Sequence, residues 1–248
     1  VLRLIDKYLQ KNTKLVVLSH LLWNTGQIMP IELISKRLKE HSSNPYLLVD
    51  AAQSFCHVPI QGACKHADIY AFTGHKWACG PEGLGGVVVS ERVLEESNPT
   101  LVGWRSLQQE GSIYTPPSDP FHLDARRFEI ATSCIPLLAG LRSSLKLIER
   151  EYPKGRFLRI KKLSFTLWQE LNQLDGIKTI LQGPPPSGLV SFSIINKFSP
   201  SSLVQALGEQ EIWIRVLEDP IWLRACLHIM TTEEEIITLV ETIKNLMK

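Results

Sequence analysis

Residues 72–86 have the sequence Phe72-Thr73-Gly74-His75-Lys76-Trp77-Ala78-Cys79-Gly80-Pro81-Glu82-Gly83-Leu84-Gly85-Gly86. In this stretch a lysine follows a hydroxyl, a glycine and a histidine, and several glycines come after it at short intervals. The order Gly-x-x-x-x-Gly-Lys-Ser/Thr is missing, so a nucleotide-binding P-loop is a poor match. A lysine beside glycines is commonly a solvated surface residue, and its chemistry therefore depends on the partners that the rest of the chain supplies.

Apolar segments around this stretch predict an α/β fold. Four short apolar runs have the length of buried strands: residues 15–19, 46–50, 68–73 and 85–90. A helix is expected at residues 31–41, with Leu33, Ile34 and Leu38 on one face. Because the strands are apolar throughout and are separated by helices, we expect both faces of the sheet to be covered.

Polar side chains gather where these strands end. They are Ser19-His20, Asp50, and residues 73–76, which include the lysine. In open α/β sheets, ligands bind at the carboxyl ends of the strands. The sequence therefore predicts a ligand site along this edge of the sheet.

The second half of the chain predicts a smaller α+β unit. Helices are expected at residues 135–150, 155–174 and 201–211, and strands at residues 177–181, 189–195, 212–217 and 222–227. The last helix is expected to begin at Thr231 or Thr232, since each offers a Thr-x-x-Glu capping box. We expect a partial large domain over residues 1–135, followed by a linker helix and a small C-terminal domain over residues 136–248.

The composition argues against several classes of protein. Hydrophobic residues make up 44% of the 248 residues, which is enough for a sizeable core and argues against disorder. Lys and Arg number 27 against 25 Asp and Glu, and a net charge of +2 argues against a general nucleic-acid binder. No apolar run reaches the roughly 18 residues that a membrane span needs. We therefore expect no nucleic-acid or membrane partner.

The five cysteines are odd in number and contain no Cys-x-x-Cys pair, so neither a disulfide framework nor a zinc site is expected. We expect reduced and mostly buried thiols, and a location in the cytoplasm or an organelle stroma. The chain begins with Val1 and runs at once into an apolar helical pattern, which predicts that it is cut from a longer protein.

Two residues near the end of a neighbouring strand change the interpretation of Lys76. Asp50 ends that strand, and Gln53 follows three residues later. A lysine in a pocket can be unprotonated enough to form a Schiff base. An acid beneath a pyridine nitrogen keeps that nitrogen protonated and makes the ring an electron sink. With Thr73 and His75 as phosphate donors, these are the parts of a pyridoxal phosphate (PLP) site.

Asp50-Ala51-Ala52-Gln53 followed by Thr73-Gly74-His75-Lys76 resembles the signature of PLP enzymes with the class V aminotransferase fold, which include the cysteine desulfurases. Further matching stretches follow in order along the chain: residues 19–26, 102–105, 127–132, 223–226 and 232–236. The resemblance is closest to the L-cysteine/L-cystine C–S lyase branch. It implies the PLP-dependent transferase fold (fold type I), with a mainly parallel sheet in the large domain and with the N-terminal third of the subunit missing.

The resemblance implies a role for each residue at the predicted cofactor site. Lys76 would form the Schiff base and move the substrate proton. Asp50 would pair with the pyridinium nitrogen, and Gln53 would donate to the phenolic oxygen. Thr73 and His75 would hold the phosphate. Outside this context, Asp50 could be a cap and His75 an ordinary turn residue.

The resemblance assigns further residues to the substrate and to a second subunit. Arg215 and Arg224 would bind the substrate carboxylates, a task that suits the planar guanidinium group. Thr132 would reach the cofactor phosphate of the partner subunit, which implies a homodimer. Asn24 and Trp104 would line the pocket. The structural alternatives are surface strand positions for the arginines, a loop hydroxyl for Thr132 and packing for Trp104.

One position departs from the pattern. Desulfurase relatives often have an asparagine three residues after the histidine of the Ser19-His20 segment. Here that position is Trp23, and Asn24 comes one residue later. The pocket role of Asn24 therefore rests on a shifted match.

The absence of a suitably placed thiol favours a lyase over a desulfurase. The resemblance places the sulfur-accepting cysteine five residues after the first substrate arginine, and residues 216–220 contain none. Cys226, which lies in a predicted strand, is expected to be a packing thiol. We therefore expect β-elimination from cystine or cysteine to pyruvate, ammonia and persulfide or sulfide, with a sulfur acceptor as a further partner. The alternatives are a cysteine desulfurase or selenocysteine lyase that uses another thiol, and an inactive fragment.

Overall fold

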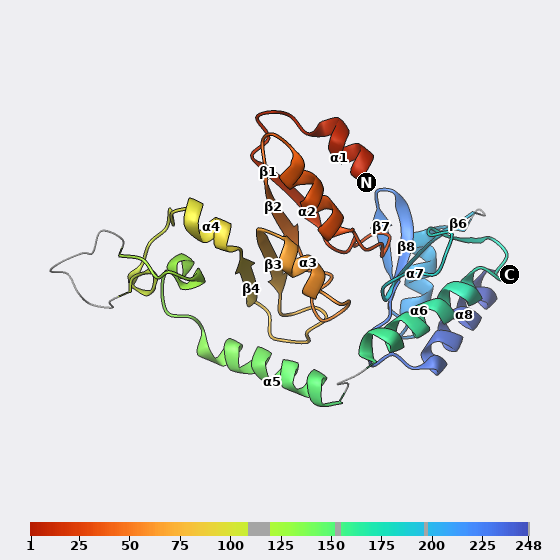
Figure 1. The fold of residues 1–248 in the computed structure, drawn as a ribbon. Helices are drawn as coiled ribbons and strands as arrows, with labels where there is room; N and C mark the ends of the chain where they lie inside the picture. The colour runs from red at the N-terminus through yellow and green to blue at the C-terminus, as the bar shows by residue number, and fades with distance from the viewer. Residues whose placement is uncertain (109–119, 152–154, 196–197, 248) are drawn as a thin grey trace. The chain divides into compact units, whose positions relative to one another are not determined.

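The computed structural model describes residues 1–108, 120–151, 155–195 and 198–247 (Figure 1). These residues form two compact units. The first contains Val1–His20, Pro30–Ala52 and Ile60–Leu147, and the second contains Leu21–Met29, Gln53–Pro59 and Ile148–Lys248. Two short segments from the first half of the chain thus belong to the same unit as the C-terminal half. The domain limits at residues 135 and 136 stay a prediction.

The first unit is built on a four-stranded sheet with the order β1-β2-β3-β4. Its strands are β1 (Leu15–Ser19), β2 (Tyr46–Asp50), β3 (Ile69–Thr73) and β4 (Gly85–Val89). The first three strands run parallel, and β4 is antiparallel to β3. The sequence predicted all four strands to within one residue at each end, because each is a short apolar run bounded by polar residues or glycines.

Helix α2 (Ile31–Glu40) packs on one face of this sheet, with α1 (Leu2–Tyr8) and α3 (Gln61–His66) in contact with this helix. The other helical elements of the unit are α4 (Glu91–Glu96), most of α5 (Ile135–Glu151), and the 3-10 turns η1 (Trp104–Ser106) and η2 (Ala125–Phe128). Ile34 and Leu38 of α2 are fully buried, as are Leu47 and Val49 of β2. Leu33, in contrast, is 55% exposed, so the prediction that it shares the buried face of α2 is wrong.

The opposite face of the sheet is apolar but partly open. Leu15, Val17 and Val87 lie on this face and are 47%, 60% and 55% exposed. Within the described residues, the prediction that both faces are covered is therefore wrong. The strands carry apolar residues on both sides, and the part of the chain that the structure describes buries only one of them.

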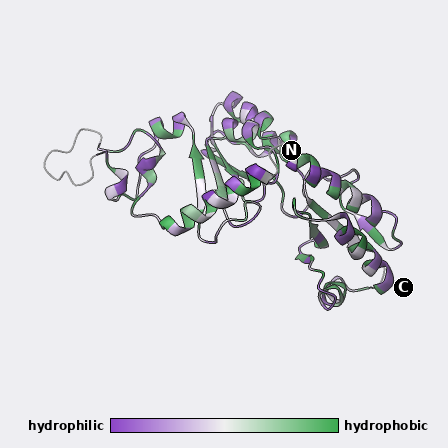
Figure 2. Cartoon of the chain, turned by 90° about the horizontal axis from the view of Figure 1, so that it is seen from below, coloured by the Kyte–Doolittle hydropathy of each residue, from purple (hydrophilic) through white to green (hydrophobic). Residues whose placement is uncertain are grey.

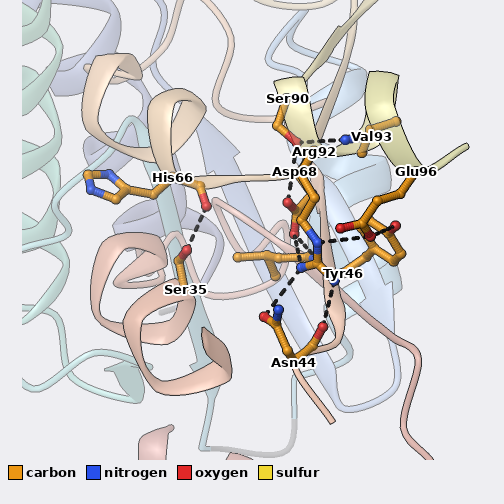
Figure 3. Close-up of polar contacts among 10 residues, drawn as sticks. Ser35, Asn44, Tyr46, His66, Asp68, Ser90, Arg92, Val93 and Glu96 are labelled. Atoms are coloured by element: carbon orange, nitrogen blue, oxygen red, sulfur yellow. Dashed lines mark hydrogen bonds and ion pairs between the residues drawn. The ribbon is translucent and has the colours of Figure 1, made fainter. Parts of the chain in front are cut away.

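A polar cluster joins the strands at the end of the sheet where β2 and β3 begin (Figure 3). Asp68 accepts hydrogen bonds from the Leu47 backbone N–H at 2.8 Å and from the Ser90 hydroxyl at 3.3 Å. The Arg92 guanidinium lies 3.8 Å from the Asp68 carboxylate and 4.1 Å from the centroid of the Tyr46 ring. These contacts fix the start of α4 against β2 and β3. The sequence missed α3 and α4 because six residues are too few to display a helical period.

The second unit has a four-stranded antiparallel sheet with the order β5-β6-β8-β7. Its strands are β5 (Ile177–Thr179), β6 (Leu189–Ile194), β7 (Arg215–Glu218) and β8 (Ile221–Cys226). Its helices are α6 (Arg156–Leu171), α7 (Pro200–Gly208) and α8 (Glu233–Leu246). Leu167, Phe192, Leu223 and Ile243 are fully buried in the core between sheet and helices. The helices show hydrophilic and hydrophobic residues side by side along their length, as amphipathic helices do (Figure 2).

Two boundaries of this unit illustrate which local signals succeed. Thr232 and Glu235 form a capping box, with hydrogen bonds of 2.8 Å and 3.2 Å, so α8 starts at the second of its two predicted positions. Strand β7, in contrast, begins three residues later than predicted. Ile212 and Ile214 pack against the core instead of pairing, after Glu211 with a left-handed φ of 60° ends the preceding turn.

In the described part of the chain, no helix is long and apolar enough to cross a membrane.

Candidate active site

The carboxyl ends of the parallel strands bring the first group of predicted site residues together. Ser19, Asp50 and Ala71 are register partners on β1, β2 and β3, so the three strands end side by side. Thr73 is the last residue of β3. One Asp50 carboxylate oxygen accepts a hydrogen bond from the Ala52 backbone N–H at 2.8 Å, which turns the chain sharply after β2. The polar edge that the sequence predicted is therefore present.

The turn after β3 presents Lys76 to solvent. The Gly74 N–H donates to the Leu84 carbonyl, and the Gly80 N–H donates to the Gly74 carbonyl, both at 2.8 Å. A Cβ atom at Gly80 would lie 2.6 Å from a Leu141 methyl group, so helix α5 packs directly on this turn. Gly74 is buried whereas His75 and Lys76 are exposed. The backbone that carries the lysine is thus fixed by contacts on its buried side, and the lysine side chain faces solvent.

The Thr73 hydroxyl is buried, and no hydrogen-bond partner for it exists among the described residues. A buried hydroxyl without a partner costs free energy, and such groups call for an explanation such as an absent ligand. The hydroxyl stands three residues before Lys76, at the end of the strand. Its chemistry suits an anionic oxygen acceptor such as a phosphate.

Two other predicted residues of this unit lie outside its sheet. Trp104 is in η1 and is 44% exposed, with its ring centroid 5.0 Å from the Arg105 guanidinium. Thr132 lies exposed in the segment before α5. Within the described residues, no hydrogen bond joins either of them to Lys76.

In the second unit, two arginines stand directly opposite each other. Arg215 on β7 and Arg224 on β8 are register partners, and Ser191 on β6 is the partner of Arg224 on the other side. The three side chains form one row across the sheet, on the face away from the core residue Leu223. Arg224 is only 9% exposed, and its Nε is buried without an acceptor in the described chain. Neither arginine takes part in an ion pair with a described acidic residue.

The segment Leu21–Met29 lies against this row. The Arg224 Nη1 donates to the Trp23 carbonyl at 2.7 Å, and the Ser191 hydroxyl donates to the Asn24 carbonyl at 2.6 Å. The Ser187 hydroxyl donates to the Gly26 carbonyl at 2.8 Å. Asn24 is thus held beside Arg224 by its main chain. Sequence reasoning missed Ser191 and the carbonyl of Trp23, because main-chain acceptors and a single serine leave no signal in a sequence.

The segment Gln53–Pro59 is held by a buried histidine. The Nδ1 of His57 lies 2.8 Å from the Gln53 carbonyl, and its Nε2 accepts a hydrogen bond from the Gly188 N–H at 2.7 Å. This arrangement requires a neutral ring that donates through Nδ1. Burial lowers the pKa of His57 to about 3, against a smaller upward effect of the Gln53 hydrogen bond. His57 therefore positions the backbone of Gln53, a role that the sequence did not reveal.

Two buried histidines, His57 and His20, predict a loss of stability in acid. In the first unit, the buried His20 lies 2.9 Å from the Tyr70 hydroxyl, and burial lowers its pKa to about 4. Because both folded-state pKa values lie below the value of about 6.5 for a free imidazole, the unfolded chain binds more protons between these limits. Stability is therefore complete above about pH 6.5 and is expected to fall toward pH 4, by up to about 1.4 kcal/mol per pH unit for His57.

Urea unfolding at pH 7, 6, 5 and 4.5 measures this slope. His57→Gln should make the slope shallower, whereas the matched control His41→Gln, at the C-terminal end of α2, should leave it unchanged. An unfolding midpoint that stays constant over this range would contradict the neutral, buried state of both rings.

The hairpin between the two arginines is too short for a thiol-bearing loop. Strands β7 and β8 are joined by Asp219-Pro220 alone, and Glu218 pairs with Ile221. Cys226 is exposed and shares the sheet face of Arg224, so the prediction that it is a packing thiol is wrong. The wider prediction of mostly buried cysteines is also wrong, since Cys79 and Cys134 are exposed too.

Comparison with protein families identifies the fold. Residues 2–239 match the family model of aminotransferase class-V. The chain belongs to the class-V aminotransferase family. Among the curated relatives of this chain, a probable cysteine desulfurase of Pyrococcus abyssi is 28% identical over 96% of the chain and 61% of its own length. A cysteine desulfurase of Haloferax volcanii is also 28% identical, over 94% of the chain and 55% of its own length.

Solved structures agree with this class-V aminotransferase fold. A complex of the cystine C–S lyase C-DES with its reaction product cysteine persulfide has a TM-score of 0.89 and 39% identity, covering 98% of this chain and 64% of that one. A C-DES mutant with glycine covalently linked to its PLP cofactor has a TM-score of 0.88 and 38% identity over 99% of this chain. The predicted α/β transferase fold is therefore confirmed. The chain spans less than two thirds of the length of these relatives.

Proposed function

We propose that this class-V aminotransferase is a PLP-dependent carbon–sulfur lyase that catalyses β-elimination from cystine or cysteine. The observation that carries the proposal is the hairpin of β7 and β8. It sets two arginines, neither with an ion-pair partner among the described residues, opposite each other and joins them through Asp219-Pro220, with no cysteine in the loop. The likeness of the whole chain to the cystine C–S lyase C-DES, at 39% identity, supports the choice of substrate.

The residues at the strand edge fit PLP. The buried hydroxyl of Thr73 has no hydrogen-bond partner among the described residues, and a phosphate oxygen would supply one; Asp50 offers a carboxylate at the same edge. Thr73 and His75 would hold the phosphate, Asp50 the pyridinium nitrogen and Gln53 the phenolic oxygen, with Lys76 as the covalent attachment point. When bound, the cofactor supplies an electron sink for the negative charge that forms at the substrate Cα.

The side chains of this protein bind the substrate and remove its Cα proton. Arg224 and Arg215 bind carboxylate groups, which orients the substrate. The Lys76 amine takes the proton from Cα, and the Cβ–S bond breaks with its electron pair moving to sulfur. A persulfide leaves from cystine more readily than hydrosulfide leaves from cysteine, because its conjugate acid is the stronger one. With one water molecule, cystine yields cysteine persulfide, pyruvate and ammonia.

Product analysis tests the proposal. The chain is incubated with PLP and cystine, and pyruvate, alanine and persulfide are measured. Equal amounts of pyruvate and persulfide are expected. Alanine with a protein-bound persulfide would favour the second candidate, a cysteine desulfurase or selenocysteine lyase. The exposed thiol of Cys226 on the Arg224 face is the observation that favours this candidate, so Cys226→Ser is tested in parallel.

We further infer that the protein acts as a homodimer. The exposed position of Thr132 is compatible with a contact to the cofactor phosphate of a partner subunit. A thiol-containing sulfur acceptor would consume the persulfide, and the reduced thiols suit a cytoplasmic or stromal location.

Thr73→Val is expected to weaken PLP binding about tenfold or more, since a hydrogen bond to a charged group contributes about 1.5–3 kcal/mol. In the absence of PLP the same substitution should leave the thermal stability unchanged or higher, because it removes a buried hydroxyl that has no partner. Titration with PLP, followed by absorbance, and thermal unfolding measure the two effects. Thr73→Ser is the control that keeps the hydroxyl. Equal PLP affinity of Thr73→Val and the original chain would exclude Thr73 from the phosphate site.

A further inference from the structure

Trp23 contacts the row formed by Arg215, Arg224 and Ser191, and the proposed function assigns this tryptophan no role. Its main-chain carbonyl accepts the hydrogen bond from Arg224 Nη1 at 2.7 Å. Its ring centroid lies 5.8 Å from the Cζ atom of the same guanidinium, within the range of a cation–π contact. Arg224 is thus held by two different parts of one residue.

This arrangement determines which edge of the Arg224 guanidinium remains for a ligand. Because Nη1 is engaged by the Trp23 carbonyl, the side-on edge made of Nε and Nη2 is left for a bidentate carboxylate. Nε is buried without an acceptor among the described residues, which agrees with this use. The second guanidinium, that of Arg215, is exposed and directly across the hairpin. Like charges at such positions repel each other unless anions lie between them.

The indole ring of Trp23 is 46% exposed although it is a large apolar surface. An exposed aromatic ring beside Arg224, with a second guanidinium across the hairpin, suits a ligand that is apolar in the middle and carries a carboxylate at each end. A disulfide amino acid has this character, with a –CH2–S–S–CH2– centre between two carboxylates. Cysteine has one carboxylate and no second half. Sulfur also makes favourable contacts to aromatic rings, in addition to the apolar area that is buried.

We propose that Trp23 is a specificity-determining residue that favours cystine over cysteine by covering the second half of the disulfide. The proposal rests on the proposed lyase function and names the substrate feature that its arginine row selects. Trp23 is also the position at which the sequence departs from the asparagine of the desulfurase pattern.

Kinetics with two substrates test the selection. Trp23→Asn should lower the ratio of kcat/KM for cystine to that for cysteine by about tenfold, mainly through a higher KM for cystine. Trp23→Phe should stay within about threefold of the original ratio, because it keeps an aromatic face. Every substitution at this position retains the carbonyl that holds Arg224, so the loss is specific to the ring. Trp213→Asn is the matched control, since Trp213 is 80% exposed in the same unit. An unchanged ratio in Trp23→Asn would overturn the proposal.

A binding measurement separates this proposal from the proposed function. The indole N–H resonance of Trp23, assigned with Trp23→Phe, is followed while L-cystine or S-methyl-L-cysteine is added, with and without PLP. Cystine is expected to shift the resonance at about tenfold lower concentration than S-methylcysteine. Equal responses, or no response to cystine in either condition, would overturn the role of Trp23. If cystine binds selectively but no pyruvate forms, the lyase function fails and the binding role stands.

Discussion

Lys76→Ala is expected to lower the rate of pyruvate formation from cystine by roughly 10³-fold or more. The amine has two tasks in the proposed reaction, covalent attachment of the cofactor and removal of the Cα proton. Proton transfer by a positioned side chain alone contributes typically about 10²–10⁴-fold. Lys76→Arg should be as inactive, because a guanidinium stays protonated and cannot act as the nucleophile. Pyruvate formation is measured with a coupled assay, and cofactor attachment by the visible absorbance band.

The environment of Lys76 makes this substitution a clean test. The side chain is exposed, and no ion pair holds it within the described residues. The turn that carries it is fixed by backbone hydrogen bonds of Gly74 and Gly80 and by the packing of Leu141, none of which the substitution touches. The melting temperature should therefore be unchanged. Lys65→Ala, at an exposed lysine of α3 in the same unit, is the matched control and should keep full activity. A Lys76→Ala variant that retains a tenth of the original rate would refute the assignment.

Local sequence patterns were sufficient for the sheet of the first unit. Strands β1 and β2 coincide with their predicted limits, since each is a continuous apolar run that ends at polar residues. The same reasoning failed at Leu33, which is apolar but exposed, and at Ile212 and Ile214, which pack against the core without pairing. In both cases tertiary contacts decide which apolar residues are buried, and such contacts cannot be inferred from a short window of sequence.

The candidate site shows a similar division. The sequence placed Asp50 and Thr73 at one edge because parallel strands end together, and the register confirms that edge. The direct opposition of Arg215 and Arg224 depends on the register of a hairpin, which a turn of one more residue would change. The carbonyl that holds Arg224 is 201 residues away in the chain, a separation at which no sequence spacing gives information. The catalytic roles of these residues stay predictions until the variants are measured.

Arg224→Gln is expected to lower kcat/KM for cystine by about 10²-fold or more. Truncating one partner of a buried, hydrogen-bonded charge pair costs about 2–5 kcal/mol, and every 1.4 kcal/mol is a factor of ten. A substrate carboxylate bound to Arg224 would complete such a pair, because the arginine is 9% exposed and its Nε is buried without an acceptor in the described chain. The loss should appear mainly in KM, since the carboxylate is bound before and during the reaction. Arg159→Gln is the matched control, because Arg159 also donates to main-chain carbonyls, those of Ile229 and Thr231.

The partner across the hairpin should respond differently, and the contrast distinguishes a binding role from a structural one. Arg215 is exposed, so Arg215→Gln is expected to raise the KM for cystine only about tenfold. The same change should slightly raise the melting temperature of the ligand-free protein, because it removes a like charge directly opposite Arg224. Cystine should then stabilise the original chain against heat more than it stabilises Arg215→Gln, since a ligand that binds only the folded state shifts the transition by mass action. If both arginines only support the sheet, each substitution will lower the melting temperature and cystine will stabilise both proteins equally.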